Sequence, residues 1–392
     1  MYILLFLCFL HFLSAQSITI SKDYTPPSAK CVDYDIRLTV SAKGKRWAGP
    51  KWNDNYDLTD FVSILGSRPD SRLSEPLDGS VDISGNYTLS STFCAPKTQG
   101  QHSGTVLLAT HGLGYDRSYW NYASEPEHYN FVQYATGQGY SVFFYDRLGT
   151  SRTSKLSGYV NQASIQVQIV KSLATLIKSG KYTDTVGIPK QLILLGHSFG
   201  SFTTQALLTE APQIADAAIL TGMAYSQDPR VVIEALDLRI ANRQNAKWKG
   251  LDNGYVIWND VFGNINKQFN VANSPFSSFF KAPLYTQAVA NYSENTKVPF
   301  AIAELLTIDT LNQSFRPTEF KGPVLYFNGE YDFIVCGGYC PNIVEEPAKK
   351  YFSKSKSLKV KVQPVTGHGL NTHVNATAGY KVIFDFLKEQ GL

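Results

Sequence analysis

Charged residues are few in this sequence, and they are not gathered into blocks. Asp, Glu, Lys and Arg make up 17% of the 392 residues, and the formal net charge at pH 7 is only +4. Because Lys and Arg are scattered along the chain, this pattern indicates an ordinary solvated surface and argues against a nucleic-acid-binding face. Internal repeats, low-complexity tracts and linkers are also missing, so we expect a single globular domain.

Long apolar runs are missing beyond the amino terminus. Residues 2–13 are almost continuously apolar, and the small residues Ser14 and Ala15 follow them. This pattern predicts a signal peptide over residues 1–16, since the run is too short to cross a bilayer comfortably. No later stretch reaches spanning length without charge, so we expect an exported protein, residues 17–392, with no stable membrane span.

Cysteine is scarce as well, with five in the chain, and signal cleavage would remove Cys8. The remaining four allow three pairings. Cys31 opens one predicted strand and Cys94 closes the next, so an antiparallel pair of strands would bring them together. Cys336 and Cys340 enclose three residues and fit a local disulfide. A zinc half-site is the alternative for this second pair, but no second half-site accompanies it. We therefore expect two disulfides, no metal and no cofactor.

Four acceptor sequons for N-glycosylation agree with export. Each has the form Asn-x-Ser/Thr, and their asparagines are Asn86, Asn291, Asn312 and Asn375. A single sequon arises easily by chance, so only the set carries weight. Together with the signal peptide and the even number of remaining cysteines, the set indicates a eukaryotic secretory route.

Two kinds of strand pattern follow one another along the chain. Residues 33–41 and 81–93 alternate apolar and polar side chains, which predicts half-exposed antiparallel strands with an ordered loop between them. From residue 104 onward, fully apolar runs alternate with stretches of helical spacing. The runs are 105–109, 140–145, 191–195, 217–220, 323–327 and 358–364. Buried strands separated by helices predict a mostly parallel sheet flanked by helices on both faces.

Residues 224–321 interrupt this alternation. The segment has weak helical patterns and many aromatic residues: Trp248, Trp258, Phe262, Phe269, Phe276, Phe279 and Phe280. It lies between two predicted sheet strands, where an insertion would reach the end of the sheet that carries an active site. We therefore expect one catalytic domain with an inserted helical cap or lid.

The strongest chemical signal is Gly-x-Ser-x-Gly around Ser198. Gly196 and Gly200 flank it, an apolar strand pattern precedes it, and a helical pattern follows directly. Glycines in this context permit the sharp strand-to-helix turn that lifts a nucleophilic hydroxyl out of a sheet. A plain turn between strand and helix is the alternative interpretation.

A serine hydroxyl needs a base to accept its proton, and that base needs an orienting acid. In the chain order Ser, Asp, His, the acid is expected at Asp332, just after the apolar run 323–327. The base is expected at His368, which follows the last apolar run. His373 is the alternative base, and Glu330 and Asp228 are alternative acids.

The reaction also needs backbone N–H donors for the oxyanion of a tetrahedral intermediate. Phe199, the residue after the nucleophile, should supply one. The loop His111-Gly112-Leu113-Gly114 follows the first apolar run, and Leu113 should supply the other. We interpret His111 as a structural residue of this loop, and residues 146–149 as a tight turn that holds it.

Together these segments resemble the α/β-hydrolase superfamily from about residue 82 to the end. They are the His-Gly loop, the Asp-Arg-x-Gly turn, Gly-His-Ser-Phe-Gly, Gly-x-x-Asp and Gly-His-Gly-Leu-Asn. The signal peptide, the sequons and the residues after His368 look like secreted fungal serine esterase or lipase-like members. The resemblance implies the α/β-hydrolase fold, with Ser198, Asp332 and His368 as the triad. Ser151 departs from the pattern, because many relatives have a second glycine there.

We expect the protein to hydrolyse a carboxylic ester with an apolar group, lipid-like or aryl, through an acyl-enzyme on Ser198. Acyl transfer, tailoring of a secondary metabolite and serine peptidase activity would use the same triad and remain alternatives. A non-catalytic role is disfavoured because all three triad residues are present. The small-molecule substrate is the only partner expected, and the protein should be a monomer or a simple homo-oligomer.

Overall fold

The computed structural model describes residues 19–20, 23–66, 76–225, 233, 236–258, 279–308, 310–311 and 315–392. The predicted signal peptide, residues 1–16, lies outside the described residues. So do Asn312, the alternative acid Asp228, and three of the cap aromatics: Phe262, Phe269 and Phe276.

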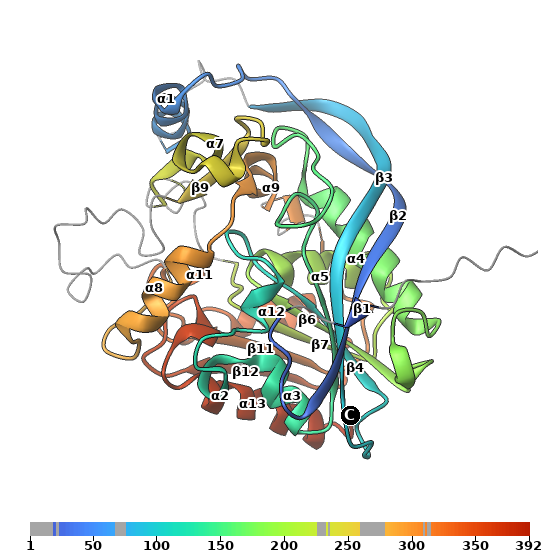
Figure 1. Cartoon of the computed structure of the whole chain (residues 1–392). Coiled ribbons are helices and arrows are strands. Elements are labelled where there is room, and N and C mark those ends of the chain that lie inside the picture. The colour runs from blue at the N-terminus through green and yellow to red at the C-terminus, as the bar shows by residue number, and fades with distance from the viewer. Residues whose placement is uncertain are drawn as a thin grey trace, which may run out of the picture.

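A nine-stranded sheet forms the centre of the molecule, in the order β1-β2-β3-β5-β4-β6-β7-β11-β12 (Figure 1). The first three strands, β1 (Thr19–Ile20), β2 (Ala29–Trp47) and β3 (Leu77–Pro96), run antiparallel to their neighbours. The remaining pairs are parallel. These strands are β4 (Thr105–Thr110), β5 (Ser141–Tyr145), β6 (Gln191–His197), β7 (Ala217–Thr221), β11 (Val324–Gly329) and β12 (Leu358–Gln363). The predicted mostly parallel sheet is confirmed.

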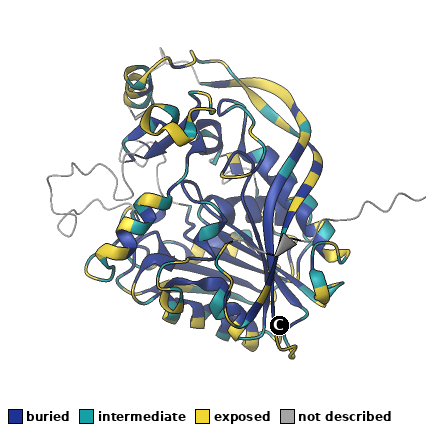
Figure 2. Cartoon of the chain, in the orientation of Figure 1, coloured by how far each residue is buried: buried dark blue, intermediate teal, exposed yellow. Residues whose placement is uncertain are grey.

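Helices cover both faces of this sheet. On one face, α3 (Phe131–Gly137) packs with α13 (Ala376–Glu389), and α2 (Pro126–Tyr129) lies beside them. On the other, α4 (Ala163–Lys178) packs with α5 (Phe199–Glu210). Two further helices follow β11: α11 (Phe333–Cys336) and α12 (Glu345–Tyr351). The strands β4, β5, β7 and β11 are buried along their whole length, as the dark centre of Figure 2 shows. The edge strand β12 is not, since Val362 is 37% exposed, so the prediction of a buried strand over 358–364 is wrong: an edge strand has a neighbour on one side only.

The hairpin of β2 and β3 is much longer than the alternating patterns predicted, and its far half rises beside the upper part of the molecule (Figure 1). The loop predicted between the two strands is wrong in part, since it contains the helix α1 (Asn55–Gly66). Asp54 Oδ1 accepts hydrogen bonds from the amides of Tyr56 and Asp57 at its start. Leu58 is fully buried. The helix therefore forms because a capped amino-terminal turn precedes an apolar side.

The segment between β7 and β11 forms a separate layer above the sheet. Its described helices are α7 (Ala241–Gln244), α8 (Gln287–Thr296) and α9 (Ile302–Leu306). Alongside them lies a three-stranded antiparallel sheet of β8 (Leu238–Ile240), β9 (Tyr255–Trp258) and β10 (Phe300–Ala301), which the sequence patterns did not predict. Strands of two to four residues are too short to show a period of two.

Both predicted disulfides are present. Cys31 and Cys94 are directly paired across β2 and β3, with 4.1 Å between their Cα atoms. Cys336 and Cys340 form the local disulfide, which leaves neither thiol for the alternative zinc half-site. Within the described ranges, no helix combines the length and apolar character needed to cross a membrane.

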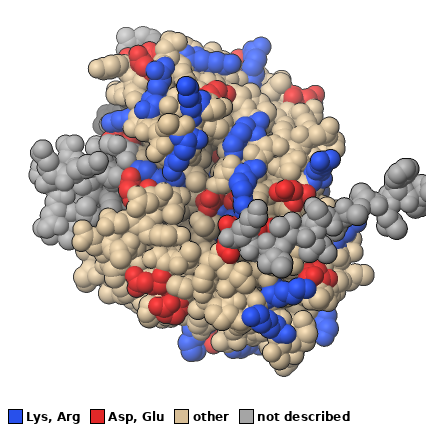
Figure 3. All heavy atoms as spheres, viewed as in Figure 1, with Lys and Arg blue, Asp and Glu red and all other residues tan. Residues whose placement is uncertain are grey.

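Basic and acidic side chains are interspersed on the face shown in Figure 3. Many charged side chains of the described residues pair with a neighbour of opposite sign, such as Lys43 with Asp82 and Lys381 with Asp385. This arrangement agrees with the solvated surface that the scattered charges predicted.

Candidate active site

Ser198 occupies the turn between β6 and α5 in a conformation that side chains rarely adopt. Its φ is 53° and its ψ is −121°, and backbone strain of this kind gathers at functional positions. The amide of Ser198 donates to the Thr221 carbonyl at 2.9 Å, while its carbonyl accepts from Ser201 at 2.8 Å. These bonds fix the turn at the carboxyl ends of β6 and β7. The side chain is only half-buried, unlike its neighbours on both sides.

The glycines around Ser198 are required by close contacts. A Cβ on Gly196 would lie 2.5 Å from the carbonyl oxygen of Gly200, and one on Gly200 would lie 2.1 Å from the carbonyl oxygen of Thr110. A Cβ on Gly112 would lie 2.9 Å from Cβ of Ser198 itself. The loop after β4 is therefore packed against the turn that carries Ser198, and any larger residue would separate them.

Asp332 and His368 form a buried hydrogen-bonded pair. Nδ1 of His368 donates to Oδ2 of Asp332 at 2.7 Å, and the two side chains are 1% and 0% exposed. Asp332 Oδ1 accepts from the amide of Val335 at the start of α11, so both carboxylate oxygens are engaged. The pairing fixes Nδ1 of the imidazole as the protonated nitrogen and leaves Nε2 to accept a proton.

Three loops bring Ser198, Asp332 and His368 into one region. His197, the neighbour of Ser198, has its ring centroid 4.9 Å from that of His368. A Cβ on Gly329 would lie 2.2 Å from the Gly367 carbonyl oxygen, so the strand end before Asp332 touches the loop before His368. No direct Ser198–His368 hydrogen bond is present between these two described residues. In enzymes without bound substrate such bonds are often long and tighten when substrate binds.

His373 forms hydrogen bonds with the backbone of the His368 loop. Its Nδ1 donates to the Gly369 carbonyl at 2.8 Å, and its Nε2 accepts from Gly367 at 3.1 Å and from Lys281 at 3.0 Å. Both ring nitrogens are engaged, and burial lowers its pKa to about 4. This histidine therefore anchors the backbone on each side of His368 and is poorly placed to act as a base.

The alternative acid Glu330 is also engaged elsewhere. Its Oε2 accepts from the amide of Val365 at 2.8 Å. That bond ties the end of β11 to the turn that follows β12. Neither of the alternatives that can be placed, Glu330 or His373, forms a hydrogen bond with the Ser198 turn in the described structure.

The loop that follows β4 orients the Leu113 amide. The Gly112 carbonyl accepts from His111 Nδ1 at 2.8 Å and from Arg147 Nη2 at 3.4 Å. In a trans peptide the N–H points away from the preceding carbonyl. These two donors therefore turn the Leu113 N–H away from Arg147. No described residue accepts a hydrogen bond from Leu113 N–H or Phe199 N–H, so both donors remain available to a ligand.

His111 is a structural residue in this arrangement. Its Nε2 accepts from the amide of Arg147 at 3.1 Å, so both of its nitrogens serve the loop. Burial lowers its pKa well below 6.5, and the charge of Arg147 adds to this. The ring therefore stays neutral and joins the loop after β4 to the turn after β5.

A buried ion pair, which was not predicted from the sequence, contacts the loop after β4. Arg147 Nη1 donates to Glu304 Oε1, and the side chains are 0% and 1% exposed. Glu304 belongs to α9 and also accepts from Gln166 Nε2 at 2.8 Å and from the amide of Ala301 at 3.2 Å. The guanidinium lies 4.5 Å from the ring centroid of Phe199. One cation thus contacts both segments that carry the proposed oxyanion donors.

His197 is kept neutral beside His368. Burial lowers its pKa well below 6.5, and the nearby His368 and His111 add to the effect. Thr221 Oγ1 donates to the Gly196 carbonyl and therefore accepts from His197 Nδ1 at 3.1 Å. Tyr119 stacks on the other side of the ring at 4.4 Å. A neutral neighbour does not oppose the positive charge that a general base acquires.

Aromatic side chains surround this region. Phe279 meets His368 edge-on at 5.5 Å, and Trp258 and Tyr115 contact Phe279 at 4.8 and 5.5 Å. The indole of Trp258 occupies the space beside Gly114, where an added Cβ would lie 1.5 Å from its Cζ2. The segment inserted after β7 therefore touches the loop after β4. The aromatic composition of the segment predicted such a surface but not which residues form it.

A cavity of about 620 Å³ lies between the inserted segment and the sheet domain. Gly149, Ser151 and Lys155 line one side of it, and Trp248 and Tyr292 line the other. Val298 also lines it, and its amide donates to the Gly114 carbonyl at 2.9 Å.

Three of the predicted glycosylation sites can be placed. Asn86 on β3 and Asn291 on α8 are exposed, whereas Asn375 is half-buried. Asn375 Nδ2 donates to the Pro364 carbonyl, and its Oδ1 accepts from Gln363 and Thr366. A glycan on Asn375 would be attached to the same Nδ2 that donates to Pro364. Across the described part of the chain, no group of three His, Cys, Asp or Glu side chains is arranged to hold a metal.

Comparison with solved structures finds proteins of similar architecture. A monoacylglycerol lipase from Paleococcus ferrophilus is 14% identical, with a TM-score of 0.49, over 77% of this chain and 99% of the other. A thermophilic esterase from Thermogutta terrifontis is 15% identical, with a TM-score of 0.47, over 77% and 94%. The peroxisomal α/β-hydrolase Lpx1 of Saccharomyces cerevisiae is 12% identical, with a TM-score of 0.45, over 91% and 89%.

Comparison with curated proteins finds no match. One family model, described as serine aminopeptidase, S33, matches residues 102–360, which is more than half of the chain. The match includes Ser198, the loop after β4 and Asp332, and it ends before His368. With its mostly parallel sheet flanked by helices, this hydrolase has the α/β-hydrolase fold and belongs to the family described as serine aminopeptidase, S33.

Proposed function

We propose that this protein is an exported serine hydrolase that cleaves carboxylic esters through an acyl-enzyme on Ser198. The observation that carries the proposal is the buried Asp332–His368 hydrogen bond at 2.7 Å, with the His368 ring 4.9 Å from the ring of His197, the residue before Ser198. An imidazole oriented by a carboxylate close to a serine hydroxyl is the arrangement that activates this weak nucleophile.

In the proposed reaction, His368 Nε2 takes the hydroxyl proton as Ser198 Oγ attacks the ester carbonyl carbon. Asp332 stabilises the resulting imidazolium, and the N–H groups of Leu113 and Phe199 bind the oxyanion. Collapse of the intermediate breaks the bond to the alcohol, which leaves with the proton from His368. A water that gives its proton to His368 then attacks the acyl-enzyme, releasing the acid and restoring Ser198.

The surroundings of the site favour an apolar ester. Phe279, Trp258 and Tyr115 are buried aromatic walls next to His368 and the Leu113 loop, and such walls suit an acyl or aryl group. Peptidase activity is the second candidate, because the family description names an aminopeptidase. An aminopeptidase needs a carboxylate to bind the substrate ammonium. Asp332 and Glu304 are already paired with His368 and Arg147.

Labelling with a fluorophosphonate probe tests the nucleophile. The wild-type protein should label and Ser198→Ala should not. Ser201→Ala is the matched control, since Ser201 lies one helical turn away, is buried, and donates to the Thr221 carbonyl at 2.8 Å. That variant should still label. A Ser198→Ala protein that labelled as the wild type does would refute the assignment.

A substrate panel then separates the candidate activities. Rates for p-nitrophenyl esters of increasing chain length are compared with rates for aminoacyl amides of the same leaving group. Ester hydrolysis predicts activity on the first series, and peptidase activity predicts the second. Adding an alcohol acceptor tests acyl transfer, which would give a new ester in place of the free acid.

Export and glycosylation can be tested in eukaryotic cells. The full chain should appear in the medium, and a chain lacking residues 1–16 should stay inside the cell. Treatment with an N-glycosidase should lower the mass of the secreted protein. Asn86→Gln and Asn291→Gln should each remove part of that shift, because both asparagines are exposed. Size-exclusion chromatography tests the expected monomer or simple homo-oligomer.

A further inference from the structure

Two aromatic side chains beside the proposed catalytic centre carry buried polar atoms without a hydrogen-bond partner. They are Nε1 of Trp258 and the hydroxyl of Tyr115, in residues that are only 2% and 4% exposed. Folded proteins satisfy nearly all such groups, because a buried donor has lost its bond to water and gained nothing in return. Two unsatisfied donors on rings that both contact Phe279 therefore call for an explanation.

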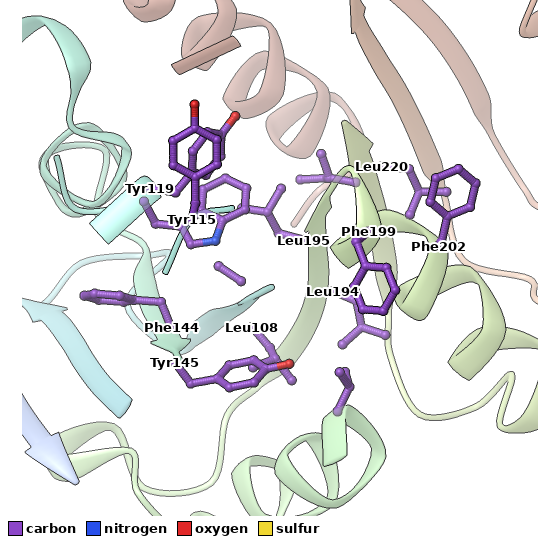
Figure 4. Close-up of a cluster of buried hydrophobic side chains, with 14 of the residues drawn as sticks. Leu108, Tyr115, Tyr119, Phe144, Tyr145, Leu194, Leu195, Phe199, Phe202 and Leu220 are labelled. Atoms are coloured by element: carbon purple, nitrogen blue, oxygen red, sulfur yellow. The ribbon is translucent and has the colours of Figure 1, made fainter. Parts of the chain in front are cut away.

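Both side chains lie against the loop that carries Leu113. The indole of Trp258 fills the space beside Gly114, one residue beyond Leu113, and Tyr115 is the next residue along. Both rings contact Phe279, which lies edge-on to the imidazole of His368. Figure 4 shows Tyr115 beside Tyr119, with their two hydroxyls on the same side of the cluster. Tyr119 in turn stacks on His197, next to Ser198.

The position of Trp258 is fixed from several directions. Its carbonyl accepts from Lys297 Nζ at 3.1 Å, and its ring packs on Phe300 at 5.0 Å. Val298, between these two residues, donates to the Gly114 carbonyl. The indole N–H is therefore presented by a rigid element, as a recognition group needs to be.

We propose that Trp258 and Tyr115 form a polar subsite that binds an oxygen of the substrate other than the scissile ester group. This inference rests on the proposed ester hydrolysis and narrows its substrate. An indole nitrogen only donates, so its ligand atom is an acceptor. The substrate is then an ester whose apolar part carries an ether, hydroxyl or carbonyl oxygen. A free ammonium, as in an aminopeptidase substrate, could not accept from Trp258.

Trp120 supplies a comparison within the same molecule. Its Nε1 is also buried without a partner, and its ring packs between Phe131 of α3 at 5.4 Å and Tyr119 at 5.0 Å, with no ring contact to Phe279 or His368 among the described residues. An unsatisfied indole nitrogen is therefore not in itself a sign of a site. What distinguishes Trp258 is its place between Gly114 and Phe279, the ring that contacts His368 and that Tyr115, with the second unsatisfied donor, also contacts.

The test compares three p-nitrophenyl esters of equal chain length, one without and two with an oxygen in the acyl chain. p-Nitrophenyl pentanoate and p-nitrophenyl 3-methoxypropanoate have chains of equal length, with an oxygen replacing one methylene, and 2-ethoxyacetate moves that oxygen by one position. The quantity measured is the ratio of kcat/KM for an oxygen-bearing ester to that for pentanoate. Intrinsic ester reactivity cancels when this ratio is compared between wild type and variants.

Trp258→Phe and Tyr115→Phe should each lower this ratio about tenfold for at least one of the two oxygen-bearing esters, the effect expected for one lost hydrogen bond. Trp120→Phe should leave the ratio unchanged. Tyr115→Phe removes an uncompensated hydroxyl, so its melting temperature should be equal to or higher than that of wild type. If the Tyr115 hydroxyl were only structural, its removal would not lower the kcat/KM ratio while leaving the melting temperature unchanged or higher. Unchanged ratios in both variants, or an equal fall in Trp120→Phe, would overturn the proposal.

Binding to the Ser198→Ala protein keeps the test independent of turnover. Calorimetric titration with the same intact esters should show tighter binding of an oxygen-bearing ester, and Tyr115→Phe in this background should abolish the difference. If fluorophosphonate fails to label Ser198 but the binding difference is present, the proposed function fails and the subsite stands. If labelling succeeds and no binding difference appears, the subsite alone is refuted.

Discussion

Replacing Glu304 by glutamine should damage both the stability and the activity of this protein. The Arg147–Glu304 pair is fully buried, and burial raises the pKa of Glu304 while the Arg147 charge opposes that shift. Arginine cannot give up its proton. Glu304→Gln therefore leaves a buried cation without a counter-charge, whereas Arg147→Met leaves a carboxyl that can become neutral by protonation.

Breaking a buried pair by removing one partner costs about 3–5 kcal/mol. With an unfolding entropy of about 2 cal/mol/K per residue, a chain of 392 residues should then lose about 4–6 °C in melting temperature. The loss in melting temperature of Arg147→Met should be smaller at acidic pH, where the Glu304 carboxyl is more easily protonated, than at neutral pH. The double variant Arg147→Met/Glu304→Gln removes both charges and should regain part of the stability lost by Glu304→Gln.

Activity should not recover in the double variant. Arg147 contacts the Gly112 carbonyl and the Phe199 ring, so its loss lets the proposed oxyanion donors shift. A displacement of about 1 Å at a reacting centre costs up to about 100-fold in rate. We expect kcat for a p-nitrophenyl ester to fall about 10- to 100-fold in both Arg147→Met and the double variant, with a smaller change in KM.

Arg117 offers the matched control. It is a second, nearly buried arginine, paired with Asp23 at 2.6 Å, and it contacts neither Gly112 nor Phe199. Arg117→Met should lower the melting temperature and leave kcat near the wild-type value. If the double variant regained wild-type kcat, or if Arg117→Met lost as much activity as Arg147→Met, the positioning role of Arg147 would be wrong.

Three further outcomes follow from buried groups. Burial lowers the pKa of His373 to about 4, so only the unfolded chain binds its proton between pH 6.5 and 4. As the pH is lowered from 6.5 to 4, the free energy of unfolding should therefore fall by up to about 3 kcal/mol. The melting temperature of His373→Gln should depend less steeply on pH than that of wild type. Burial raises the pKa of Asp146 to about 7, so the native state holds a proton that the unfolded chain releases above pH 4. The melting temperature of Asp146→Asn minus that of wild type should therefore increase as the pH rises from 4 to 7. The Cys31–Cys94 disulfide spans 63 residues, and replacing both cysteines by serine should cost about 4 kcal/mol in denaturant unfolding.

The parallel strands were predictable because their environment is uniform. With helices on both faces, β4 to β7 are buried at nearly every position and read as continuous apolar runs. The small sheet of β8, β9 and β10 could not be predicted in the same way. Its pairings join residues up to 46 positions apart, such as Ala301 with Tyr255, in strands too short for a pattern.

Local geometry explains how much of the candidate site the sequence revealed. The Ser198 turn depends on Gly196 and Gly200, and the loop after β4 depends on Gly112. Short sequence motifs therefore identify these parts of the candidate site. The supporting groups are tertiary. Arg147 and Glu304 are 157 positions apart, and the anchoring by His373 depends on a backbone amide at Lys281. No motif links such residues, because only the folded chain brings them together.

Gly114 is another position whose role depends on a tertiary contact. The sequence motif predicted a close backbone approach at Gly112 alone. Its φ is +76°, and an alanine Cβ there would lie 1.5 Å from Cζ2 of Trp258. Gly114→Ala therefore has two costs, a strained backbone and the displacement of a ring held by Phe279 and Phe300. Gly139→Ala has only the first, because its φ is +89° with nothing within 4 Å of an added Cβ.

Both variants should lose about 1 kcal/mol to backbone strain. Only Gly114→Ala should also change tryptophan fluorescence and lower kcat, because the ring that leaves Gly114 no longer supports the Leu113 loop. The double variant Gly114→Ala/Trp258→Ala removes the overlap and should lose less stability than the two single changes added together. Strictly additive losses would mean that the indole does not rest on Gly114, and that the inserted segment leaves the Leu113 loop unsupported.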